Sequence, residues 1–234
     1  MDRAEDLQGL LAGDAISLRL GASTTIANYR VPGYLAALRR QHPDARINLT
    51  VGNTSAVIAD VASMRVDIGL IEGGCHHPDL TVVPWTVDEL VVFVTRGHAL
   101  AQLSCAVMLA DAAWLLREQG SGTREEFERK LLPHLGRLRV DMELGDSESI
   151  KRAVAAGLGI SCLSRSVVVD LLASGDVVEI SGLPVLARTL YRIQHRARSL
   201  TRGVTALLKI LTLETMEDGA VEVRNNCKFE RING

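Results

Sequence analysis

One pattern recurs along this chain: a strand-like apolar run, a loop of small polar residues, and a segment with helical periodicity. The first unit joins the run 16–20 (ISLRL) through the loop GASTT to a helical segment over 26–41, which Pro32 must kink or restart. The next unit has a strand over 46–51, the loop GNTS and a helix over 56–64. Strands that alternate with helices of this length predict an α/β fold with largely parallel sheets.

A second series of the same units begins near residue 114. The strand WLL runs into the stretch REQGSGTREEFE, and a helix follows in which Phe127, Leu131 and Leu135 recur every four residues. A strand over 139–144 then leads through GDSES into a helix over 150–158. Two series of about 80–90 residues each predict two lobes.

Further apolar runs predict strands over 67–71, 81–83 and 89–95. An amphipathic helix over 200–213 lies far from the first series in sequence, yet it needs an apolar partner. The first lobe has only two long helices, so we expect this last helix to pack there.

Composition narrows the classes of function. The chain has 234 residues, of which 47% are hydrophobic, so it can bury a core. Its net charge of −2 argues against binding nucleic acid through a basic face, and its 3% aromatic content argues against a stacking platform for bases. No apolar run reaches the roughly 18 residues of a membrane span, and the first residues lack a secretory pattern. The four scattered cysteines fit a reduced protein, so we expect a cytoplasmic one.

Hydroxyl and amide residues fill four predicted strand-to-helix junctions. In open α/β sheets, ligands bind beyond the carboxyl ends of the strands, where helix N-termini offer unpaired N–H groups and partial positive charge. Two junctions from each lobe facing one another would form a polar site for a small anion. The junctions are Ser23-Thr24-Thr25, Asn53-Thr54-Ser55, Ser121-Gly122-Thr123 and Ser147-Glu148-Ser149.

Helix capping is the alternative role for the same residue types. Thr123 and Glu126 have the spacing of a capping box, and Ser149 could also be a cap. Arg124 lies in a first helical turn, where it supplies a positive charge either to a ligand or only to solvent.

Enzyme motifs fit poorly. The stretch GSGTRE lacks the spacing and the lysine of a phosphate-binding loop, and GLGISC lacks the third glycine and the following helix of a dinucleotide fingerprint. GDSES lacks the last glycine of a nucleophile elbow, and the six histidines lie outside the four junctions. Adjacent ligands such as those of Cys75-His76-His77 would crowd one metal ion. We therefore predict neither an enzyme nor a metal site, and no cofactor.

Several separated stretches resemble one family in order and spacing. They run from LRLGASTTIANYRVPGYLAALRRQHPDARINLTVGNTS through DELVVFVTRGHALA, REQGSGTREEFE and GDSESIKRAVAAGLGISCLS to RTLYRIQHRARSLTRGVTALLKIL. Together they resemble the effector-binding domain of LysR-type transcriptional regulators, from residue 1 to about 213.

The resemblance implies an α/β fold of the periplasmic-binding-protein-like type 2, with two Rossmann-like subdomains joined by two crossover strands. Subdomain I would comprise 15–93 and 192–213, and subdomain II would comprise 94–191. Residues 1–14 would end a linker helix, and 214–234, which match nothing in the family, would form a disordered tail.

The resemblance also implies a function. The domain would bind a small anionic metabolite of sulfur or carbon metabolism in the cleft between subdomains, self-associate to a homodimer, and reach DNA only through a missing N-terminal winged helix-turn-helix domain. Glu118 and Glu148 would oppose a highly charged anion unless Arg124 or an amine on the ligand offsets them. The alternative is a free-standing solute-binding protein of the same fold. The implied effector contacts are Ser23, Thr24, Thr25, Asn53, Thr54, Ser121, Gly122, Thr123, Arg124, Ser147 and Glu148.

Overall fold

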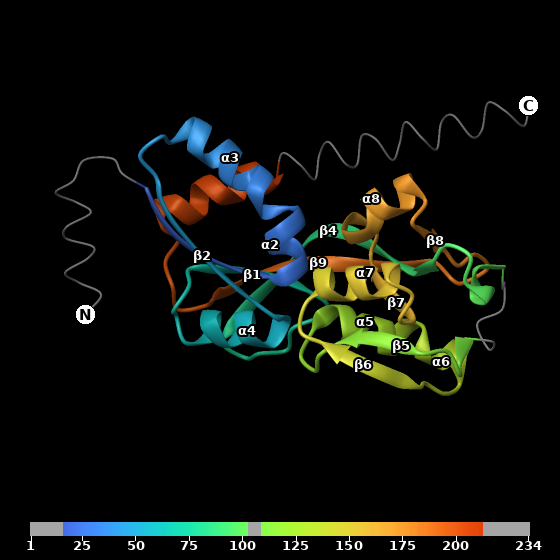
Figure 1. Cartoon of the computed structure of the whole chain (residues 1–234). Coiled ribbons are helices and arrows are strands. Elements are labelled where there is room, and N and C mark those ends of the chain that lie inside the picture. Colours follow the sequence, from blue (N-terminus) through green and yellow to red (C-terminus); the bar gives the residue numbers. More distant parts are fainter. Residues whose placement is uncertain (1–15, 103–108, 213–234) are drawn as a thin grey trace, which may run out of the picture.

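A computed structural model describes residues 16–102 and 109–212, which form two α/β lobes side by side (Figure 1). Nine strands hydrogen-bond into one sheet in the order β2-β1-β3-β9-β4-β7-β5-β6, with β8 paired to β4. The strands are β1 (Ser17–Ser23), β2 (Arg46–Gly52), β3 (Ile68–Glu72), β4 (Leu80–Thr95), β5 (Trp114–Arg117), β6 (Val140–Leu144), β7 (Ile160–Ser164), β8 (Val177–Glu179) and β9 (Leu186–His195).

Helices cover both faces of this sheet. They are α2 (Thr24–Tyr29), α3 (Val31–Gln41), α4 (Thr54–Ala62), α5 (Gly122–Lys130), α6 (Leu132–Leu135), α7 (Ser147–Ala155), α8 (Arg165–Ser174), the 3₁₀ turn η1 (Ala99–Gln102) and a helix over 202–212. No helix within the described ranges is long and apolar enough to cross a membrane.

The first lobe is built on the parallel strands β2, β1 and β3. Side chains alternate across a strand, so Leu18 and Leu20 of β1 point to the same face, where both are fully buried. That face carries α2, α3 and the helix over 202–212, whose Leu207 joins the same core. On the other face, α4 packs with Val57 and Val61. The last helix therefore packs on the first lobe, as its apolar stripe predicts.

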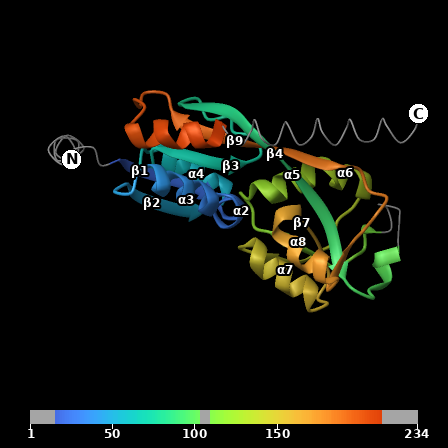
Figure 2. The same ribbon diagram turned by 90° about the horizontal axis from the view of Figure 1, so that it is seen from above.

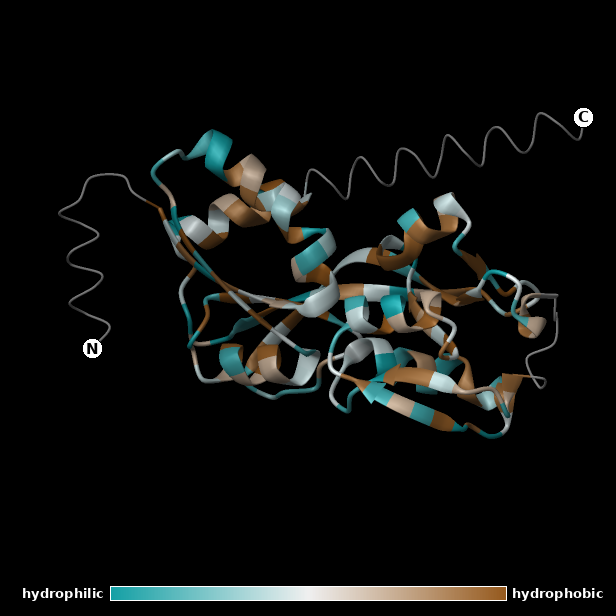
Figure 3. Ribbon diagram, viewed as in Figure 1, coloured by the Kyte–Doolittle hydropathy of each residue, from teal (hydrophilic) through white to brown (hydrophobic). Residues whose placement is uncertain are grey.

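The second lobe repeats the arrangement around β7, β5 and β6. Leu90, Val92 and Val94 of β4 face the core under α5 and α6, whereas Val91 and Phe93 face the core under α7 and α8. Figure 3 shows the result, with hydrophobic residues along the strands of this lobe. A strand that is buried on both faces reads as a continuous apolar run, which is why the sequence VVFV is so apolar.

Two long antiparallel strands, β4 and β9, run from one lobe into the other (Figure 2). They pair from Leu80 with His195 to Leu90 with Leu186, and their register shifts between Pro84 and Thr86. Proline has no N–H group to donate to a strand partner, so an irregularity there is expected. From Leu90 onward, β4 also pairs with β7. Residues 90–93, which were expected in subdomain I, therefore form part of the sheet of the second lobe.

Two predicted elements differ from the structure. The strands expected over 81–83 and 89–95 are one continuous strand, β4. Pro133 starts a new helix, α6, where one helix was expected through Leu135. The restart expected at Pro32 is confirmed: two helices meet at Arg30, with Pro32 in the first turn of α3. The expectations for residues 1–14 and 214–234 lie outside the described residues.

Candidate effector-binding site

The four polar junctions meet where the lobes touch, as Figure 2 shows for α2, α5 and α7. Thr25 Oγ1 lies 3.3 Å from Ser147 Oγ, which links the junctions before α2 and α7. The Ser55 amide donates to the Gly120 carbonyl over 3.1 Å, which links the junctions before α4 and α5. Parallel strands place their carboxyl ends at the same edge, so the sheet order of the two lobes brings these loops together.

Ser23 begins α2, but its side chain makes no capping hydrogen bond. Ser23 is 1% exposed, and the hydroxyls of Ser23 and Thr24 have no hydrogen-bond partner among the residues that the structure describes. A buried hydroxyl without a partner is costly, so these two groups point to a missing acceptor or donor.

Ser121 repeats this situation at the start of α5. It is 1% exposed, makes no capping bond, and its Oγ atom has no partner within 16–102 and 109–212. The next residue, Gly122, lies very close to the backbone of the first lobe. A Cβ atom at Gly122 would lie 2.1 Å from the Glu72 carbonyl oxygen, so only glycine permits this approach. The Gly122 amide donates to Thr54 Oγ1 over 3.3 Å.

The junction before α4 is already hydrogen-bonded within the protein. The Asn53 side chain caps α4 by accepting from the Ala56 amide over 3.0 Å. Thr54 donates to the Glu72 carbonyl over 3.2 Å while it accepts from Gly122. In the present arrangement, these two side chains join the lobes or cap the helix.

The capping-box prediction for Thr123 is wrong. Ser121 is the N-cap residue of α5, and Thr123 lies inside the first turn. Its hydroxyl donates to Glu72 Oε2 over 2.9 Å, and Glu126 instead pairs with Arg129 and Lys130. Ser149 is not the cap of α7 either, because its amide donates to the side chain of Asp146.

Two charged candidates are engaged by other side chains. Arg124, 9% exposed, forms ion pairs with Glu128 and Glu143 and donates to the Arg117 carbonyl. Its pKa is raised, because the hydrogen bonds to these glutamates outweigh the opposing effect of burial. It is therefore not a solvated arginine.

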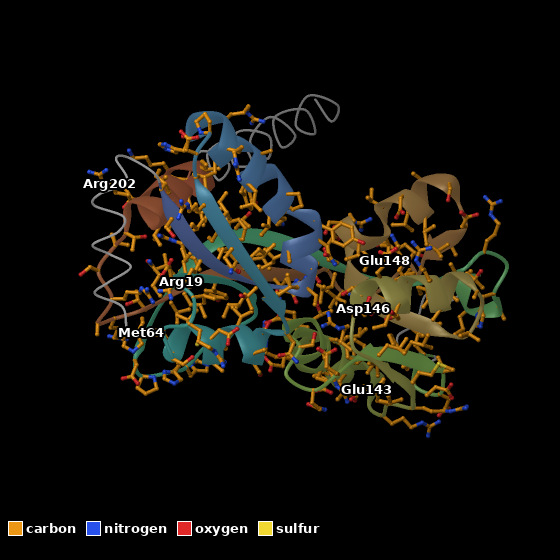
Figure 4. The ribbon with its side chains drawn as sticks, turned by 60° about the vertical axis from the view of Figure 1, so that its left-hand side comes forward. Arg19, Met64, Glu143, Asp146, Glu148 and Arg202 are labelled. Carbon is orange, nitrogen blue, oxygen red and sulfur yellow. The ribbon has the colours of Figure 1, made fainter. Side chains whose placement is uncertain are left out.

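Glu148 accepts a 2.7 Å hydrogen bond from the Tyr29 hydroxyl, which crosses from the second lobe to the first. It also pairs with Lys151 and Arg152. Burial raises its pKa, but the hydrogen bonds from Tyr29 and Lys151 outweigh that effect and lower it overall. In Figure 4, Glu148 and Asp146 lie at the start of α7, on the side of the second lobe that faces the first.

Sequence reasoning missed Arg117, the last residue of β5. It is 2% exposed, and its Nη1 atom donates to Ser147 Oγ over 3.1 Å. Its Nε and Nη2 atoms donate to the two carboxylate oxygens of Glu118 over 2.8 and 2.9 Å. The available signal was a charged residue directly after the apolar run WLL. Ligands bind at the edge of the sheet where this strand ends, and a buried charge at that position points to a functional site.

A buried charge cluster at the crossover strands was also missed. Arg188 of β9 pairs with Asp88 of β4 at 2.6 Å and lies 3.4 Å from Glu72 of β3. Arg188 also donates to the Thr123 hydroxyl over 2.9 Å, and Ser164 donates to Asp88 over 2.8 Å. Burial alone would raise the pKa of Glu72, but the charge of Arg188 and the hydroxyls of Thr25 and Thr123 lower it overall. Ionised Glu72 therefore holds elements of both lobes together.

The chemistry of this site suits binding. It offers buried hydroxyls, helix N-termini and one guanidinium, Arg117, held by a single neighbouring carboxylate. Two α/β lobes that are joined by two strands and contact one another through such groups define a ligand-binding domain of the periplasmic-binding-protein-like type 2 fold.

Comparisons with known proteins give the family. A match to the LysR substrate binding domain covers residues 12–214, and the chain belongs to that family. It is 45% identical over 210 residues to the HTH-type transcriptional regulator YeiE of Escherichia coli K12, a match that covers 89% of this chain and 72% of that protein.

Solved structures agree with this assignment. The regulatory domain of Synechocystis CcmR, in complex with 2-phosphoglycolate, is 29% identical and superposes with a TM-score of 0.76 over 85% of this chain and 97% of that chain. The effector-binding domain of QuiR, in complex with shikimate, shares the fold with a TM-score of 0.75 at 20% identity, over 85% of this chain and 96% of that chain.

Proposed function

We propose that this domain is the effector sensor of a cytoplasmic LysR-type transcriptional regulator and that it binds a small anion between its lobes. The observation that carries the proposal is the set of buried, unpartnered hydroxyls of Ser23, Thr24 and Ser121 at the contact that also holds Arg117. An oxyanion accepts hydrogen bonds from hydroxyls and from a guanidinium, so it would satisfy these groups together. The anionic ligands of the CcmR and QuiR domains support the same class of effector.

The charges favour an effector with low net charge. Arg124 and Arg188 each pair with two carboxylates, whereas Arg117 pairs only with Glu118 among the described residues, so we assign Arg117 to the effector. Asp146 and Glu148 flank Ser147, which Arg117 contacts, and they oppose a multiply charged group there. The sulfur and carbon metabolites expected from the sequence include anions of this kind.

Binding would act by changing how the lobes contact one another. Direct bonds from Thr25 to Ser147, from Tyr29 to Glu148 and from Ser55 to Gly120 join the lobes. A ligand shifts the population of such a protein only as far as it prefers one arrangement of the lobes over another. In the full regulator, the signal would then reach DNA through the winged helix-turn-helix domain.

Thermal-shift measurements test the proposal. The panel is sulfite, sulfate, thiosulfate, O-acetylserine, phosphoglycerate, 2-phosphoglycolate and small dicarboxylates, at constant ionic strength. We expect at least one anion to raise the melting temperature, and Ser23→Ala or Ser121→Ala to reduce that rise. Ser174→Ala is the matched control, because Ser174 is exposed and bonds only within its own helix end. If no anion stabilises the protein, or if both cleft variants respond as the control does, the proposal fails.

We also propose that the domain forms a side-by-side homodimer through the first helix and the second strand. Strand β2 is an edge of the sheet, and Val51 on it is 49% exposed. An unpaired strand edge with an apolar side chain favours pairing with another chain. Light scattering should report a dimer, and Val51→Lys should shift it toward monomer, whereas Val169→Lys on α8 should not.

A further inference from the structure

Arg117 presents its guanidinium fork to a carboxylate of its own chain. Two parallel N–H···O bonds, of 2.8 and 2.9 Å, run to the two oxygens of Glu118, and the remaining nitrogen bonds Ser147. This bidentate geometry is the one that arginine uses to recognise carboxylate, sulfate and phosphate groups. The fork that an effector anion would need is therefore occupied by the adjacent glutamate.

The two partners differ in their freedom to move. Arg117 is held in β5 by its pairing with Leu144 of β6, and its side chain is 1% exposed. Glu118 lies after the strand end, in the loop before α5, and its side chain is 23% exposed. Glu118 can turn toward water by rotating its side chain, whereas Arg117 has no such route.

The other acidic groups around the contact have additional partners. Asp146 caps α7, Glu148 bonds Tyr29 and Lys151, and Glu72 is held by Thr123 and Arg188. Within the part of the chain that the structure describes, the Glu118 carboxylate contacts no donor other than Arg117. Glu118 is the carboxylate that can leave at the smallest cost in hydrogen bonds.

From these contacts we infer that Glu118 is an internal anion that competes with the effector for Arg117. The inference rests on the proposed function of the cleft. When an anion arrives, it takes the Arg117 fork and the free hydroxyl of Ser121, and Glu118 turns into solvent. The exchange removes one partly buried negative charge and brings in another, so a singly charged oxyanion group leaves the charge of the site unchanged. The device favours small oxyanion groups with two oxygens on one centre, and Glu118 weakens their affinity.

The experiment compares Glu118→Gln with Glu128→Gln by calorimetric titration with sulfite, sulfate and 2-phosphoglycolate, at constant ionic strength in chloride. Both variants remove one negative charge from the same region, but Glu128 pairs with Arg124 and not with Arg117. We expect Glu118→Gln to bind the preferred anion about tenfold more tightly, because a charge-assisted competitor is gone. Glu128→Gln should bind as the unchanged protein does.

A second readout separates competition from a structural role. Glu118→Gln should lower the melting temperature of the ligand-free protein, because buried Arg117 loses its counter-ion, yet it should enlarge the rise that the anion produces. Glu118→Asp retains the charge with a shorter reach, so it should give an intermediate gain in affinity and serves if the glutamine variant does not fold.

The outcomes distinguish the two proposals. Unchanged or weaker anion binding in the Glu118 variants, alongside normal binding in the unchanged protein, overturns the competition and leaves the effector site standing. Binding that appears only in the Glu118 variants supports the competition. No anion binding in any of the proteins overturns both.

Discussion

The hydroxyl of Thr123 in the second lobe donates a 2.9 Å hydrogen bond to the carboxylate of Glu72 in the first. The same hydroxyl accepts a bond from Arg188, so one buried oxygen atom joins α5, β3 and the crossover strand β9. The contact between the lobes is thereby coupled to the crossover strand β9 through Thr123, which is 1% exposed.

Replacing this hydroxyl should destabilise the fold. Thr123→Val retains the shape but leaves Glu72 and Arg188 each short of a partner, which should cost about 1–3 kcal/mol in the free energy of unfolding. Urea denaturation measures this change in the free energy of unfolding. Thr205→Val, on an exposed turn of the helix over 202–212, should change the value by less than about 0.5 kcal/mol. Equal effects in the two variants would contradict this account of Thr123.

A methyl group at Gly122 should separate the lobes. Its Cβ would meet the Glu72 carbonyl oxygen at 2.1 Å, and that oxygen belongs to backbone that cannot yield without moving the lobes. Gly122→Ala should lower stability by about 1–3 kcal/mol and increase the radius of gyration in small-angle scattering. Gly145→Ala is the control, since a Cβ there meets no atom within 4 Å. An unaltered scattering profile for Gly122→Ala would show that the lobes do not rely on this contact.

The stability of the domain should fall in acid partly through Glu72. Its pKa in the folded protein lies below the ordinary value, because Arg188, Thr25 and Thr123 outweigh burial. Its ionised form therefore stabilises the fold above the unfolded pKa of about 4.3, and that contribution disappears as pH falls through the lower folded value. The difference in unfolding free energy between the unchanged protein and Glu72→Gln should shrink between pH 7 and pH 3. A difference that stays constant with pH would show that Glu72 is not ionised in the fold.

Cys162 should resist alkylation while the protein is folded. Burial raises the pKa of its thiol to about 12, although the nearby charge of Arg188 lowers it in part. Only about one thiol in ten thousand is ionised at pH 8, and Cys162 is also covered by the second-lobe core. Peptide mass spectrometry after iodoacetamide treatment should find half-buried Cys75 labelled well before Cys162, with the order lost in urea. Early labelling of Cys162 would mean that the second lobe opens locally.

The sequence was sufficient to predict the α/β alternation and the four polar junctions, because both are local patterns. Strand periodicity predicted β1 and β2. Ser23 and Ser121 lie at the lobe contact because Ser23 ends its strand and Ser121 follows its glycine. Local patterns could not show how a polar side chain is used. Asn53 caps its own helix, whereas Thr123, read as a cap, bonds across the lobes.

The buried charges were beyond sequence reasoning for a different reason. Arg188 and Asp88 are 100 residues apart, and they meet only because β4 and β9 pair along their length. The residues next to Arg188 in the sequence do not identify its partner. Arg117 is the exception, since its partner Glu118 is the next residue, and the sequence does not show that the Arg117 side chain is buried.

The pairing of β4 with β9 also fixes how the chain is threaded. The polypeptide enters the second lobe on one strand and returns on the neighbouring one, so Val87 and Thr189 are direct strand partners between the two lobes. Topologically, the second lobe is an insertion into the first, with its two ends separated by one strand spacing of about 4.8 Å. A short turn could close that gap and leave the strand order β2-β1-β3-β9-β4 uninterrupted.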